Sequence, residues 1–160
     1  MTKIKRTSGA GLPLEAGVKD TYFKVIFLDV GLFHAVNGIY SDTVQAKDFT
    51  ALFKGAVAEQ FVGQELLAYQ NPYTRPLLFY WAREAKNSNA ELDYLIQKEG
   101  EAIPIEVKSG SIGRLKSMHM FMEKYQVRQG IKISQAPYDS KNQIISLPLH
   151  SLEGFIRKNI

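Results

Sequence analysis

Hydrophobic residues recur at a helical spacing through the stretch 47–69. They stand three or four positions apart, and Asn71-Pro72 ends the pattern. The apolar positions are Phe49, Leu52, Phe53, Ala56, Val57, Phe61, Val62, Leu66 and Leu67. Residues at this spacing return to one face of a helix. The pattern therefore predicts a long amphipathic helix, which the proline stops.

Four shorter stretches have the β-branched and aromatic content that is typical of strands. They are 22–28, 77–81, 91–97 and 103–108. A short helix over 29–37 is predicted after the first stretch, and Asn37-Gly38 ends it. Only short polar links separate the last three stretches. They therefore predict a meander of adjacent antiparallel strands.

A second amphipathic helix is predicted over 115–125. Its apolar positions are Leu115, Met118, Phe121, Met122 and Tyr125. The methionines fit the packing of such a helix better than an exposed docking stripe. Two further strands, over 130–134 and 144–147, and a closing helix over 149–156 complete the predicted elements.

The first twenty residues carry Gly9, Gly11, Pro13 and Gly17, which interrupt any regular pattern. We expect an extended lead-in over 1–20 and one domain over 21–160, because a chain of 160 residues can bury one core. The order of helices and strands predicts the α/β class, with a mixed sheet flanked by helices.

The composition restricts the chemistry. The chain has no cysteine, which excludes disulfides, thiolate zinc sites and cysteine nucleophiles and leaves a metal to oxygen and imidazole ligands. His34, His119 and His150 lack the spacing of a zinc site. No apolar run suits a signal peptide or a membrane span, so we expect a cytoplasmic protein without membrane contact.

The formal net charge of +4 favours contact with a polyanion such as DNA or RNA, although a solvated basic surface is equally compatible with it. Four basic residues follow the candidate site described next: Lys116, Lys124, Arg128 and Lys132. They would line the path of a nucleic acid backbone or form the solvated side of a helix.

The predicted strand 103–108 places Glu106 and Lys108 on one face, because side chains alternate along a strand. The preceding strand places Asp93 and Glu91 on one face, with Leu92, Tyr94 and Ile96 on the other. If the two strands pair through the loop around Gly100, Asp93 comes within reach of Glu106.

Two such carboxylates offer the hard oxygen ligands that Mg²⁺ or Mn²⁺ prefers. A divalent ion there would stabilise the charge that develops on a phosphodiester during in-line attack. Lys108 would orient the attacking water or assist its deprotonation. The residue set therefore suits phosphodiester hydrolysis.

Two stretches around these residues, AELDYLI over 90–96 and PIEVKSG over 104–110, resemble a family of domains of unknown function. That family is found at the C-terminus of many prokaryotic AAA-type ATPases. The resemblance extends over most of the chain, in the expected order. Its other segments are FKVIFLDVGL over 23–32, GAVAEQFVGQEL over 55–66, FYWAR over 79–83, LKSMHMFMEKY over 115–125 and Leu147-Pro148-Leu149.

The resemblance implies a PD-(D/E)XK nuclease-like domain with a restriction endonuclease-like mixed sheet. Asp93 matches the aspartate of the motif, Glu106 the second acid and Lys108 the lysine, while Glu59 matches a helical glutamate that completes the metal site. Leu92 stands where the motif has proline. The chain has no phosphate-binding loop, so the ATPase module would lie in a longer version of this chain or in a partner chain.

The alternative is a non-catalytic domain that regulates or targets an ATPase by binding nucleic acid or protein. In that case Glu106 and Lys108 form an ordinary surface ion pair. Glu59 is then a polar position at the edge of its helix, and Glu91 is a charged flank of its strand. The sequence leaves open the choice between DNA and RNA and the oligomeric state.

Overall fold

The structure is a computed structural model that describes residues 1–39, 51–84, 89–110 and 113–159. Within these ranges, one mixed sheet of eight strands has the order β2-β1-β3-β4-β5-β6-β8-β7. The strands are β1 (Thr2–Thr7), β2 (Val18–Ile26), β3 (Phe79–Ala82), β4 (Glu91–Lys98), β5 (Glu101–Val107), β6 (Gly130–Ser134), β7 (Asp139–Lys141) and β8 (Ile144–Pro148). The helices are α1 (Val30–Val36), α3 (Ala51–Ala68), α4 (Lys116–Tyr125) and α5 (Leu152–Asn159), with short 3-10 turns at Leu14–Gly17 and Leu149–Ser151.

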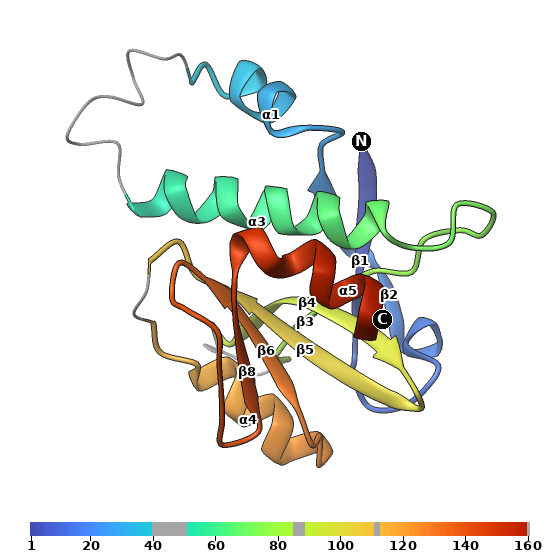
Figure 1. The fold of residues 1–160 in the computed structure, drawn as a ribbon. Helices are drawn as coiled ribbons and strands as arrows, with labels where there is room; N and C mark the ends of the chain where they lie inside the picture. Colours follow the sequence, from blue (N-terminus) through green and yellow to red (C-terminus); the bar gives the residue numbers. More distant parts are fainter. Residues whose placement is uncertain (40–50, 85–88, 111–112, 160) are drawn as a thin grey trace.

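The helices cover the two faces of the sheet unequally. Helices α3 and α5 lie together on one face, and α4 lies on the other (Figure 1). Val62 and Leu66 of α3 and Ile156 of α5 are buried in the first core. Met118 and Phe121 of α4 are buried in the second. The predicted α/β architecture with a helix-flanked mixed sheet is therefore confirmed.

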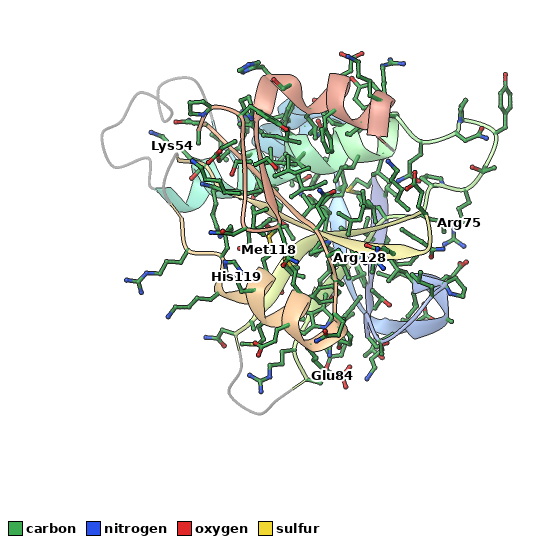
Figure 2. The ribbon with its side chains drawn as sticks, turned by 60° about the horizontal axis from the view of Figure 1, so that its bottom comes forward. Lys54, Arg75, Glu84, Met118, His119 and Arg128 are labelled. Carbon is green, nitrogen blue, oxygen red and sulfur yellow. The ribbon has the colours of Figure 1, made fainter. Side chains whose placement is uncertain are left out.

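The predicted meander is confirmed, because β4 pairs antiparallel with both β3 and β5. The long helix is also confirmed over Ala51–Ala68, while positions 47–50 of the prediction lie outside the described residues. Helix α4 packs as predicted, with Met118 against the sheet and the neighbouring His119 on the exposed side (Figure 2). Strand β7 had no predicted counterpart, since its three exposed residues have no apolar pattern.

The first twenty residues differ from the expected lead-in. Strand β1 is extended, but it lies inside the sheet, where it pairs antiparallel with β2 and parallel with β3. Ile4 and Leu14 are fully buried. The glycines and the proline that break the sequence pattern lie between β1 and β2 and not within a strand.

Helix α3 approaches the sheet closely at Gly63. A methyl group at this position would come within 2.6 Å of the Tyr94 hydroxyl and 2.7 Å of Ile26 Cδ1. The Tyr94 hydroxyl donates a 2.7 Å hydrogen bond to the carbonyl oxygen of Glu59, one turn earlier in the helix. This contact fixes the part of α3 that carries Glu59 over strand β4.

Candidate functional site

A bulge in β4 sets the direction of Asp93. In the pairing with β3, Phe79 lies opposite Leu95 and Trp81 opposite Leu92. The paired positions are three residues apart on β4 but only two apart on β3, so β4 has an extra residue. Such an extra residue changes the side-chain alternation and re-aims a side chain. As a result, Leu92 packs in the core under α4, whereas Tyr94 packs in the core under α3.

This geometry corrects one expectation. Simple alternation placed Leu92, Tyr94 and Ile96 on one face, but Leu92 lies on the opposite face from the other two. The physical reason is the bulge, because a strand with an extra residue does not keep a period of two. A bulge depends on the partner strand and cannot be seen in the pattern of β4 alone.

The Asp93 carboxylate reaches across to strand β5. The regular pairing between β4 and β5 runs up to Tyr94 opposite Ile105. Immediately beyond it, the backbone N–H of Val107 donates a 2.7 Å hydrogen bond to Asp93 Oδ2. Asp93 is therefore tied directly to the strand segment that carries Glu106 and Lys108.

Glu106 and Lys108 form an ion pair on β5 and just beyond its end. The ammonium Nζ of Lys108 lies 2.6 Å from Glu106 Oε1. Glu106 is only 6% exposed, and its second oxygen, Oε2, is buried without a hydrogen-bond partner. A buried carboxylate oxygen without a donor is costly, because it has lost its water and gained nothing in return.

Lys24 of β2 lies at the centre of the remaining acids. Its Nζ atom is 2.8 Å from Glu59 Oε1, 2.5 Å from Glu91 Oε1 and 3.9 Å from Asp93 Oδ1. The Lys24 side chain is 21% exposed. One ammonium thus joins acids from α3 and from β4.

The pKa shifts reflect this crowding of charge. Burial and then the charge of Glu59 raise the pKa of Asp93 to about 7, against the opposing effects of Lys24 and the Val107 N–H. Burial also raises the pKa of Glu106, although Lys108 opposes it. For Lys24, burial lowers the pKa, but Glu59, Glu91 and Asp93 together raise it well above its usual range.

The donor set has the chemistry of a hard-cation site, but the ammonium of Lys24 lies beside two of its members, Glu59 and Asp93. Glu59, Asp93 and Glu106 influence one another's charge, and the buried Oε2 of Glu106 has no hydrogen-bond donor. Among the described residues, however, no three acidic or histidine side chains converge as metal ligands in this arrangement. The residue types fit a divalent ion, whereas the present side-chain positions fit an ammonium.

The structure brings the four candidate residues into two linked groups. Glu59 and Asp93 gather around Lys24, Glu106 pairs with Lys108, and the Val107 N–H connects the groups. Sequence reasoning missed Lys24. A signal was present, because Lys24 stands two positions before the buried Ile26 on a strand and so points toward the core face.

Comparison with known proteins identifies a family without an assigned activity. A family model described as a domain of unknown function (DUF4143) matches residues 54–152, which is more than half of the chain. The match includes Glu59, Asp93, Glu106 and Lys108, whereas Lys24 precedes it. No curated protein and no solved structure matches the chain. No helix in the described ranges combines the length and apolar character needed to cross a bilayer.

Proposed function

Since this chain belongs to the family described as a domain of unknown function (DUF4143), its activity must be inferred from its own residues, and we propose a metal-dependent phosphodiesterase. In this proposal the domain is cytoplasmic and nuclease-like, cleaves DNA or RNA, and accompanies an ATPase module in the same or a partner chain. The fold is of the restriction endonuclease type, which the order α3, β3-β4-β5 meander, α4 and β6 supports.

One observation carries the proposal: carboxylates from α3, β4 and β5 lie close enough to influence one another's charge, in two groups that the Val107 N–H connects. Burial and mutual repulsion raise the pKa of Asp93 and Glu106, so the cluster is unfavourable unless a cation neutralises it. Clustered carboxylates with perturbed pKa values are a feature of functional sites. Mg²⁺ or Mn²⁺ is the cation that such oxygen ligands prefer.

Each residue has a distinct role in the proposed reaction. Glu59, Asp93 and Glu106 would hold the ion, which when bound supplies charge stabilisation and a more acidic water. Lys108, already beside Glu106, would orient that water or take part in its deprotonation and offset the charge of the phosphate. The Val107 N–H keeps Asp93 aligned with this strand.

Calorimetric titration with Mg²⁺ and Mn²⁺ tests the proposal at its first step. Asp93→Ala should abolish metal binding, whereas Asp20→Ala should not, because the exposed Asp20 pairs with Lys5 away from the cluster. Lys108→Ala should retain metal binding but reduce cleavage of a DNA or RNA substrate by about a hundredfold or more. Metal-dependent cleavage that survives both Asp93→Ala and Lys108→Ala would refute the assignment of roles.

A second candidate function is favoured by the ion pairs themselves. Lys24 already compensates Glu59 and Glu91, and Lys108 already compensates Glu106. Such pairing suits a non-catalytic domain that regulates or targets an ATPase by binding nucleic acid or protein. This function predicts a folded chain that shows neither metal affinity nor cleavage, including in the presence of nucleic acid.

A further inference from the structure

Lys24 lies beside the proposed metal ligands, although it belongs neither to the sequence motif nor to the residues of the family match. Its ammonium lies 2.8 Å from Glu59 and 2.5 Å from Glu91, with Asp93 at 3.9 Å. Its own strand, β2, is at the edge of the sheet, two places from β3 and three from β4. A lysine from this distant strand therefore reaches the acids that the proposed function needs for its metal.

The surroundings hold this ammonium in place. The ring of Tyr80 lies 5.2 Å from Nζ, a distance at which an aromatic face attracts a cation. The side chain is mostly buried, and its three N–H groups can be shared among the neighbouring acids. Lys5 on the adjacent strand β1 is different, because it is more exposed and pairs with the single acid Asp20.

An ammonium and a divalent ion would compete for the same oxygens. Glu59 Oε1 is a proposed metal ligand, and it accepts a hydrogen bond from Lys24. A metal ion bound by Glu59 and Asp93 would place a double positive charge within a few ångströms of Nζ, which like-charge repulsion opposes. The two cations therefore exclude each other unless the lysine side chain moves.

We propose that Lys24 is a built-in competitor of the metal: its ammonium fills the cation position among Glu59, Glu91 and Asp93, and a divalent ion binds only when it leaves. The inference rests on the metal site of the proposed function. It makes Lys24 a positioning residue, which keeps the acids together without metal and sets the concentration at which metal replaces it. A displaced ammonium would remain close enough to the site to meet a phosphate.

The test compares metal affinity in three chains by calorimetry with Mn²⁺ and Mg²⁺: the native chain, Lys24→Met and Lys5→Met. Methionine keeps much of the side-chain volume and removes the charge. Lys24→Met should bind Mn²⁺ at least about tenfold more tightly than the native chain, which corresponds to about 1.4 kcal/mol. Lys5→Met should match the native chain, since it changes the net charge equally outside the cluster.

The outcomes separate this inference from the proposed function. Equal affinity in the native chain and Lys24→Met overturns the inference and leaves the metal site intact. Weaker binding in Lys24→Met also overturns it, because Lys24 would then assist the metal. Absence of binding in all three chains overturns both the inference and the proposed function. A lysine with only a structural role would not raise metal affinity when it is removed.

A second measurement uses the native chain and does not depend on the variant being folded. Side-chain amine resonances of lysine report hydrogen bonding of Nζ, and Mg²⁺ should shift the Lys24 signal toward that of a solvent-exposed lysine. The Lys5 signal should stay unchanged in the same titration. A Lys24 resonance that does not move at saturating Mg²⁺ overturns the inference. If Lys24→Met does not fold, the native chain alone provides the test. The absence of both binding heat and a shift of the Lys24 signal in the native chain overturns the inference.

Discussion

Replacing Gly63 by alanine should leave the chain less stable than the same change at Gly55 in the same helix, which should stabilise it. At Gly63 the new methyl group would meet the Tyr94 hydroxyl at 2.6 Å and Ile26 Cδ1 at 2.7 Å. At Gly55 nothing lies within 4 Å of it. The pair thus measures how closely α3 must approach the sheet to bring Glu59 to Lys24.

The magnitudes follow from two opposing effects. Alanine in a helix interior is favoured over glycine by about 1 kcal/mol, and this gain is common to both sites. Overpacking a tight contact costs about 1–3 kcal/mol, and only Gly63 has such a contact. We therefore expect Gly55→Ala to raise the free energy of unfolding by up to about 1 kcal/mol, and Gly63→Ala to lie about 1–3 kcal/mol below it.

Urea unfolding monitored by the fluorescence of the single tryptophan, Trp81, provides the assay. Tyr94→Phe should cost about 1 kcal/mol by removing the hydrogen bond to the Glu59 carbonyl. It also removes the atom nearest to the new methyl group, so Gly63→Ala should be less harmful when combined with it. The double-mutant cycle should therefore show a favourable coupling between the two changes.

Equal stabilisation by Gly63→Ala and Gly55→Ala would contradict the close contact between α3 and β4. Such a result would mean that α3 lies farther from β4 or that its neighbours yield without cost. The contact that positions Glu59 over the site would then have no energetic basis. Additivity in the cycle with Tyr94→Phe would point to the same conclusion.

Three further predictions concern the site and the opposite core. The Asp93 carboxyl takes up its proton near pH 7 in the folded, metal-free chain, compared with near 3.8 in an unperturbed environment. Between these pH values the folded state binds more protons than the unfolded state, so the folded state becomes less stable as the pH rises. Asp93→Asn should reduce this fall in the free energy of unfolding, as measured by urea titrations at pH 4, 5.5 and 7. Lys108→Met should destabilise the chain by about 1–3 kcal/mol because it leaves Glu106 buried and unpaired, and adding Glu106→Gln should recover part of this in thermal unfolding. Phe121→Ala should cost about 3–5 kcal/mol and shift the emission of Trp81, since the two rings lie 5.3 Å apart edge to face.

The predicted role of Glu106 depends on its unpaired oxygen. Oε1 is bound to Lys108, whereas Oε2 is buried without a donor. A structural ion pair would gain from satisfying both oxygens, because an unsatisfied buried acceptor lowers stability. A ligand or metal ion that contacts Oε2 would therefore stabilise Glu106. Whether Mg²⁺ does so bears directly on the proposed function.

Local patterns determined much of the architecture. Apolar spacing predicted α3 and α4, because each of these helices buries one face against the sheet. Short β-branched and aromatic stretches predicted the β3-β4-β5 meander, in which β3 and β4 are buried on both faces. The alternation of side chains along the predicted strand 103–108 placed Glu106 and Lys108 on one side, where they form an ion pair. Such features depend on residues two to four positions apart, so they can be predicted from the sequence of the chain.

Contacts between residues far apart in the sequence set how these elements meet. The bulge that aims Asp93 arises from pairing with β3, and the placement of β1 inside the sheet arises from contacts with two strands remote in sequence. Lys24 bonds to Glu59 from 35 positions away. Register and strand order are set by the packing of the whole sheet, so the cation at the centre of the acids became visible only when the strands were placed together.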